Sequence, residues 1–171
     1  MIARFDTYQL GKTTEELVAG TSDELLEIAL AMARQCQRTL DLCSRHLDPK
    51  LFEHADFIEA VRQLARRSAR SRIRLLVLQA EGLHRRGHPL IDLAGSLSSF
   101  MEVRVPGIEH KEFNEAILIA DEIGYIHRLQ SDRFEASASF CAPARVGGLL
   151  LRFNEIWDKS ESDPNFRRLS L

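Results

Sequence analysis

The sequence predicts a single α/β domain in which a mixed, mainly parallel sheet is flanked by helices. Apolar residues follow helical and strand spacings alternately, and a strand hairpin and a final helix come last. The stretch "IRLLVLQ" at 73–79 is almost continuously apolar, which is typical of a central strand covered on both faces. The 171 residues contain no internal repeat and can bury one sizeable core, so we expect one domain.

The first half of the chain is expected to supply two helices and two strands. Thr21 and Glu24 have the spacing of a capping box, which predicts the start of a helix. The apolar face of that helix would consist of Leu25, Ile28, Ala29, Met32 and Cys36. The segment 39–44 ("TLDLCS") alternates apolar and polar residues, as a strand does. Asp56 and Glu59 predict a second capping box and a second helix, which precedes the apolar strand at 73–79.

The second half is expected to contain a short helix, three strands and a closing helix. Pro89 suits the first turn of the short helix. Segments 100–106 and 115–121 show strand patterns, and 124–129 is expected to pair with 115–121 as a hairpin. A helix is predicted over 145–160, since apolar residues recur there at helical spacing: Leu149, Leu150, Phe153, Ile156 and Trp157.

The pattern also predicts where the domain begins and ends. Residues 1–20 are polar and aperiodic, which predicts a loosely ordered N-terminal arm. The domain itself is expected over 21–160, with a polar loop at 130–145 inside it and a C-terminal tail at 161–171.

Composition indicates an ordinary globular protein and argues against several classes. The net charge is -2 and no apolar run approaches 18 residues, so neither a general nucleic-acid coat protein nor a membrane-spanning helix is expected. The N-terminal segment lacks the apolar core of a signal peptide, which favours a cytoplasmic location. The number of cysteines is odd, and Cys36, Cys43 and Cys141 are widely spaced. This pattern favours reduced thiols over a disulfide framework. His84 and His88 have no cysteine pair beside them, so no metal and no cofactor is expected.

Five segments together resemble the phospholipase D-like fold over roughly residues 22–160: "TLDLCS", "RIRLLVLQ", "MEVRVP", "AILIADEIGYIHR" and "LLLRFNEIWDKS". Three others, "SRHLDP", "RFEASASFCAP" and "DPNFRRLSL", resemble small bacterial domains of this fold that have no assigned function. Some of those domains are fused to a GNAT-type acetyltransferase, so the resemblance implies an acetyltransferase as a partner. Members of this fold often pair beside the active site, which implies a homodimer.

The family cleaves phosphodiesters with the motif H-x-K-x4-D, and this chain departs from that motif. Asp121 takes the Asp position, but counting back five and seven residues gives Ala116 and Asn114. His110 and Lys111 are adjacent and precede the strand, whereas His and Lys two apart on a strand point to one face. We therefore expect a degenerate member that lacks the catalytic His-Lys pair.

The polar residues near the predicted strand ends are candidates for a vestigial anion pocket, retained although the catalytic motif is lost. They are Arg45, Asp48, Asn114, Asp121, Arg128, Arg133 and Glu135. Arginine suits this role because its guanidinium makes a bidentate fork to phosphate or carboxylate. The alternative is that Asp48 and Asp121 are turn residues and that Arg133–Glu135 or Arg128–Asp132 ion pairs order a loop.

Two basic segments lie outside this candidate pocket. A compact basic loop contains His84, Arg85, Arg86 and His88, and it could touch phosphates or be a solvated turn. The helix before the strand at 73–79 has an arginine-rich outer face spanning 62–72, for which a solvated face is the simpler interpretation.

We therefore expect a non-catalytic binding or interaction module with an anion pocket. Two alternatives stay open. One is an enzyme of altered chemistry that uses an acid or base among Asp48, Glu109, His110 and Asp121. The other is a nucleic-acid accessory protein that uses the arginine face 62–72 and the loop 84–88, although nucleic acid is the less expected ligand.

Overall fold

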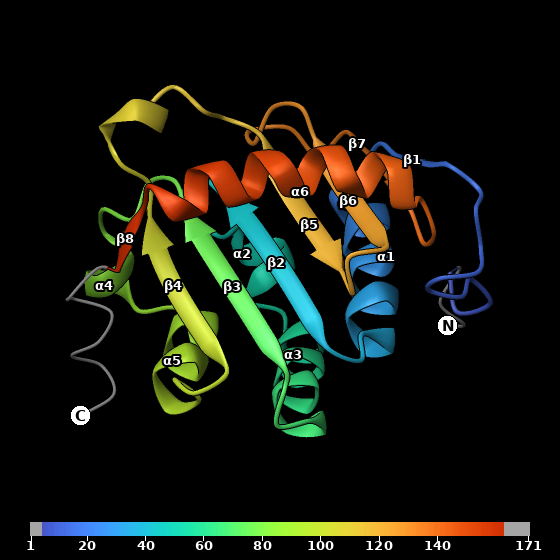
Figure 1. The fold of residues 1–171 in the computed structure, drawn as a ribbon, viewed down its shortest axis with the longest axis horizontal. Helices are drawn as coiled ribbons and strands as arrows, with labels where there is room; N and C mark the ends of the chain where they lie inside the picture. The colour runs from blue at the N-terminus through green and yellow to red at the C-terminus, as the bar shows by residue number, and fades with distance from the viewer. Residues whose placement is uncertain (1–4, 163–171) are drawn as a thin grey trace.

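The computed structural model describes residues 5–162 and contains one mixed sheet of eight strands with helices on both faces (Figure 1). The strands are β1 Leu17–Ala19, β2 Thr39–Ser44, β3 Arg72–Val77, β4 Met101–Val105, β5 Ala116–Ala120, β6 Gly124–Arg128, β7 Ala136–Ser139 and β8 Glu161–Ser162. The helices are α1 Ser22–Gln35, α2 Pro49–Phe52, α3 Ala55–Arg67, α4 Leu83–Arg86, α5 Pro89–Ser96 and α6 Pro143–Asp158, with a 3-10 turn at Ile108–His110.

The strand order across the sheet is β1-β7-β6-β5-β2-β3-β4-β8. The mixed α/β architecture is confirmed, but parallel pairing is limited to β2 with β3 and β3 with β4. The other pairs are antiparallel, because the hairpin of β5 and β6 lies beside β2 and two short strands extend the edges. The parallel part of the sheet is therefore smaller than the sequence suggested.

Helices cover the two faces of the sheet unequally. Helices α1, α3 and α5 pack on one face, and their buried side chains form the larger apolar core with inward residues of the strands. Helix α6 crosses the other face (Figure 1) and forms a second core around Phe153, Ile156 and Trp157. Between residues 5 and 162, no helix is long and apolar enough to cross a membrane.

The helix starts agree partly with the predicted caps. The Thr21 hydroxyl accepts a hydrogen bond from the Glu24 amide, and Pro89 opens α5. Helix α3 begins at Ala55 instead, and the Nδ1 atom of His54 accepts the amide hydrogen of Asp56. The second capping box was therefore wrong by two residues, because a histidine ring supplies the acceptor.

Residues 5–20, the described part of the N-terminal arm, are packed against the domain, contrary to the expected loose segment. Phe5 is buried, and the backbone amide of Gly11 donates to the Phe140 carbonyl at 2.8 Å. Strand β1 pairs antiparallel with β7, and β7 itself lies inside the predicted polar loop 130–145. Of the predicted tail 161–171, the described part forms β8, and the rest lies outside the described residues.

A buried ion pair lies between the sheet and α6. Asp41 on β2 and Arg74 on β3 face each other across the parallel pair, and Arg74 Nε donates to Asp41 Oδ1 at 2.6 Å. Asp41 is fully buried, and the guanidinium lies 4.7 Å from the Phe153 ring centre and 5.4 Å from that of Trp157. The aromatic faces compensate part of the cost of burying this cation.

We predict that Arg74→Met lowers the free energy of unfolding by about 3 kcal/mol, because it leaves the buried Asp41 carboxylate with only the half-exposed Arg72, whose Nη2 lies 3.9 Å away. The double variant Asp41→Leu/Arg74→Met should recover most of that loss, since it removes both charges. Urea denaturation of the three proteins measures both values. A double variant that is less stable than Arg74→Met would contradict the explanation.

Candidate functional site

One group of the predicted pocket residues does come together, at the side of the sheet where the C-terminal ends of β2 and β6 lie. Strand β6 runs antiparallel to β5, and β5 runs antiparallel to β2, so the last residues of β2 and β6 lie at the same edge. Arg128 ends β6 and is 3% exposed. Its Nη1 donates to Asp48 Oδ2 at 2.6 Å, its Nη2 to the Ser131 carbonyl at 2.6 Å, and its Nε to the Arg133 carbonyl at 2.7 Å.

Asn114 belongs to the same edge and is held by the same loop. The Ser131 hydroxyl donates to Asn114 Oδ1 at 2.7 Å, and the Ser131 amide donates to the Asn114 carbonyl at 2.8 Å. The ring of Phe134 lies 5.2 Å from the Arg128 guanidinium. All three nitrogens of Arg128 therefore already have partners inside the protein, and Asp48 occupies the place of an anion.

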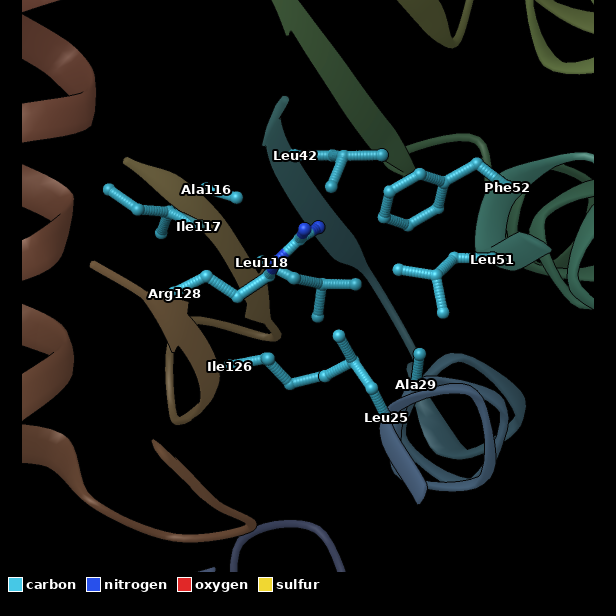
Figure 2. Close-up of a pocket in the computed structure, with 10 residues that line it drawn as sticks. All are labelled: Leu25, Ala29, Leu42, Leu51, Phe52, Ala116, Ile117, Leu118, Ile126 and Arg128. Atoms are coloured by element: carbon cyan, nitrogen blue, oxygen red, sulfur yellow. The ribbon is translucent and has the colours of Figure 1, made fainter. Parts of the chain in front are cut away.

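A small apolar cavity lies beside Arg128. Its volume is about 20 Å³, room for roughly one water molecule, but its walls offer few polar partners. Figure 2 shows Arg128 among aliphatic and aromatic side chains of β2, β5, β6, α1 and α2. Ala116, for which the resemblance implied the position of a lysine, is one of the lining residues. The cavity cannot host an anion in its present form.

Asp121 does not belong to this group, contrary to the prediction. It follows β5 at the opposite ends of the strands, where β2 begins. There its carboxylate accepts hydrogen bonds from the backbone amides of Gln37, Arg38 and Thr39 at 2.7, 2.8 and 3.0 Å. Its φ of +52° is one that Asp tolerates better than most residues. Asp121 therefore fixes the connection from α1 into β2.

The side chains of the remaining members of the predicted pocket lie elsewhere, although the Arg133 carbonyl accepts from Arg128. Among the residues that the structure describes, no hydrogen bond joins the Arg45 side chain to Arg128 or Arg133, and the buried Arg45 Nε has no partner. Arg133 and Glu135 line a different cavity of about 340 Å³. The predicted Arg128–Asp132 pair is replaced by Arg128–Asp48.

Sequence reasoning missed a polar group on the α6 face of the hairpin. His127 is 4% exposed, and its Nε2 lies 2.5 Å from Glu115 Oε1 while its Nδ1 lies 2.9 Å from Arg145 Nη2. Arg152 Nη1 donates to both oxygens of Glu115 at 2.5 and 2.6 Å. Strand alternation could have placed His127 opposite to Arg128, but no local pattern shows that α6 brings two arginines to it.

The basic loop 84–88 is built around one buried histidine. His88 is 1% exposed, its Nε2 donates to the Leu47 carbonyl at 3.0 Å, and its Nδ1 accepts the Leu90 amide at 3.1 Å. Arg85 is exposed and Arg86 lies 3.8 Å from Glu53, while the side chain of His84 lies outside the described residues. His88 is therefore a structural cap of α5, which argues against a phosphate-contacting role for it.

The cysteines are free, as expected. Burial raises the pKa values of the Cys36 and Cys43 thiols, and the nearby Asp121 and Glu115 carboxylates, respectively, add to this effect. Both thiols therefore stay protonated and unreactive at neutral pH.

Comparison with known proteins identifies the fold. The model of a family described as "Domain of unknown function (DUF7931)" matches residues 21–169. None of the curated proteins matches. Two similar solved structures are Nuc, a phospholipase D family member from Salmonella typhimurium (TM-score 0.56, 14% identity), and NucT from Helicobacter pylori (TM-score 0.64, 9% identity). Each match covers 87% of this chain and 99% of the other.

A third similar structure is TrmBL2, an archaeal chromatin protein whose structure is reported to show a novel mode of DNA binding (TM-score 0.63, 18% identity). That match covers 86% of this chain, but the chain spans only 54% of TrmBL2. These likenesses establish the phospholipase D-like fold.

We predict that Asp48→Leu lowers the free energy of unfolding by about 3–5 kcal/mol, because Arg128 would stay buried with its charge uncompensated. Asp132→Leu is the matched control, because it makes the same charge change at an exposed position of the loop that Arg128 binds, and it should change stability by less than about 1 kcal/mol. Chemical denaturation measures both variants. Equal losses would show that the pair is not what holds this edge.

The structure also predicts a pH dependence of stability. Burial lowers the pKa of His88 in the folded state, and the hydrogen bond to Leu47 offsets only part of this effect. The unfolded chain therefore binds a proton at a higher pH than the folded chain does. Stability should be complete above the unfolded value of about 6.5 and fall as pH drops below it.

His88→Asn keeps a capping oxygen and removes this titration. Unfolding free energies at pH 7.5, 6.5 and 5.5 should fall less steeply in the variant than in the parent protein. Equal slopes would mean that the other histidines of the six cause the pH dependence.

Proposed function

Because the chain belongs to the DUF7931 family and has the phospholipase D-like fold, we propose that it is a binding module that does not cleave phosphodiesters. The observation that carries this proposal is the saturated Arg128. At the sheet edge where the strands end, the arginine is bonded to Asp48 and two carbonyls instead of facing a ligand.

The chemistry of phosphoryl transfer supports the same conclusion. Covalent transfer needs an imidazole in line with phosphorus and a cation for the equatorial oxygens. Asn114 has no imidazole and is hydrogen-bonded to Ser131, and Ala116 supplies only a methyl group to an apolar cavity. His127 lies in the hairpin, but both of its ring nitrogens already have hydrogen-bond partners.

An enzyme of altered chemistry receives less support. The four residues considered for acid or base roles lie in three separate places in the described part of the chain, because only Glu109 and His110 are together, in the 3-10 turn Ile108–His110. Asp48 neutralises Arg128, Asp121 binds amides at the opposite edge, and Glu109 lies 3.1 Å from Lys159.

Binding to nucleic acid is a second candidate, and the fold likeness to the DNA-binding protein TrmBL2 is the observation that favours it. The arginine face 62–72 adds little support, since Arg62 pairs with Glu59, Arg67 donates to the Cys36 carbonyl and Arg72 lies near Glu122. The homodimer and the acetyltransferase partner remain predictions that rest on the resemblance.

The test of the proposed function combines a hydrolysis assay with a binding assay. Purified protein should not hydrolyse bis(p-nitrophenyl) phosphate or a single-stranded oligonucleotide above the level of the Asn114→Ala variant prepared in parallel. Turnover that rises with protein concentration and falls in Asn114→Ala would overturn the non-catalytic role. Fluorescence anisotropy with the same oligonucleotide at 50 and 200 mM salt tests the second candidate, because phosphate-driven binding weakens steeply with salt.

A further inference from the structure

A hollow with charged walls lies on the α6 face of the β6–β7 hairpin. Its volume is about 340 Å³, which is at the lower end of small-molecule sites. The polar lining consists of His127, Gln130, Arg133, Glu135, Ser137 and Arg145. Arg145 comes from the first turn of α6, and the other members come from β6, β7 and the loop between them.

Arg145 is held in place by a chain of hydrogen bonds that runs through the buried His127. An arginine can only donate, so His127 Nδ1 must accept from Arg145 Nη2, and the ring proton lies on Nε2, facing Glu115. Arg152 in turn holds Glu115 through both oxygens. The imidazole is therefore held with Nδ1 as the acceptor, and it orients the Arg145 guanidinium.

The chain of bonds leaves most donors of Arg145 unused. Arg145 stacks over Tyr125 at 5.6 Å, and in the described part of the protein the bond to His127 is its one hydrogen bond. A guanidinium that is oriented by a buried imidazole and stacked on an aromatic ring loses little freedom when it binds an anion. This arrangement contrasts with Arg128, whose three nitrogens are all occupied.

The charges around the hollow favour an anion. The lining contains two arginines, Arg133 and Arg145, and one carboxylate, Glu135. The nearby Glu115 is already neutralised by Arg152. The Ser137 hydroxyl and the Gln130 amide can add donors, which together exceed what a planar carboxylate needs and suit a phosphate group. Val18 and Leu129 at the rim are 78% and 73% exposed, and they offer apolar surface to an organic substituent.

We propose that this hollow binds a small phosphate-bearing molecule, with Arg145 and Arg133 as the phosphate ligands and His127 as the residue that positions Arg145. This inference rests on the proposed binding role of the module. It places the anion site on the α6 face, one residue along β6 from the saturated Arg128 and on the opposite side of the sheet.

The experiment is isothermal titration of the full chain with inorganic phosphate and with glycerol 3-phosphate at constant ionic strength, with acetate as the planar oxyanion for comparison. The proposal expects both phosphates to bind, and glycerol 3-phosphate to bind more tightly if the rim contacts the substituent. Arg145→Gln and Arg133→Gln should each weaken binding at least about tenfold. Arg66→Gln makes the same charge change on the outer surface of α3, across the sheet, and should leave binding unchanged.

A second readout separates positioning from simple structural support. His127→Gln should weaken phosphate binding. Circular dichroism and the thermal midpoint of both His127→Gln and Arg145→Gln should stay those of the parent protein. Binding of acetate with equal affinity would replace phosphate by a general oxyanion and overturn the assignment. The absence of binding, or equal loss in Arg66→Gln, would overturn the site itself. Either result leaves the hydrolysis test intact, whereas hydrolysis in that assay would defeat the non-catalytic role and not the site.

Discussion

Strand β5 runs antiparallel to β2, with Leu40 opposite Ala120 and Cys43 opposite Ile117. That pairing is the constraint from which the positions of the polar residues follow. It sends Asn114 to the edge where β2 ends and Asp121 to the edge where β2 begins. Residues seven positions apart in sequence are thereby separated by the length of a strand, and they have unrelated roles.

The hairpin then divides its polar residues between the two faces of the sheet. Neighbouring residues on β6 point in opposite directions, so Arg128 faces the layer of α1 and α2 while His127 faces α6. The first side has only an apolar cavity and carbonyl and carboxylate partners, so the arginine is neutralised internally. The second side is open between α6 and β7, and there the guanidinium groups of two arginines remain available to solvent.

Local sequence signals were sufficient for most elements of this fold. The Thr21 cap, the apolar run in β3 and the helical spacing of Phe153 and Trp157 each reflect one physical cause that acts within a few residues. Strand β7 was missed because "ASAS" has small side chains and no β-branched or aromatic residue. Strand β1 was missed because three residues are too few to show a period.

The candidate site could be predicted only in part, for a related reason. Asp48 and Arg128 were both chosen, yet they are 80 residues apart, and nothing near either one specifies the other as its partner. Asp121 was assigned to the wrong edge because the direction of β5 relative to β2 is a tertiary property. Glu115 and His127 meet within the hairpin, but Arg145 and Arg152 reach them only because α6 crosses the sheet, so no spacing in the sequence could reveal the whole group.

The antiparallel neighbour of β2 also has a consequence for synthesis of the chain. Strand β2 ends at Ser44, but β5 is complete only at Ala120, so the ribosome adds 76 residues between them. Because synthesis proceeds at about 5–20 residues per second, one edge of this apolar strand stays unpaired for about 4–15 s. During that interval the edge can pair with another nascent chain, and β3 protects only its other side. The chaperone demand of this protein should therefore be concentrated in the period when residues 45–120 are synthesised.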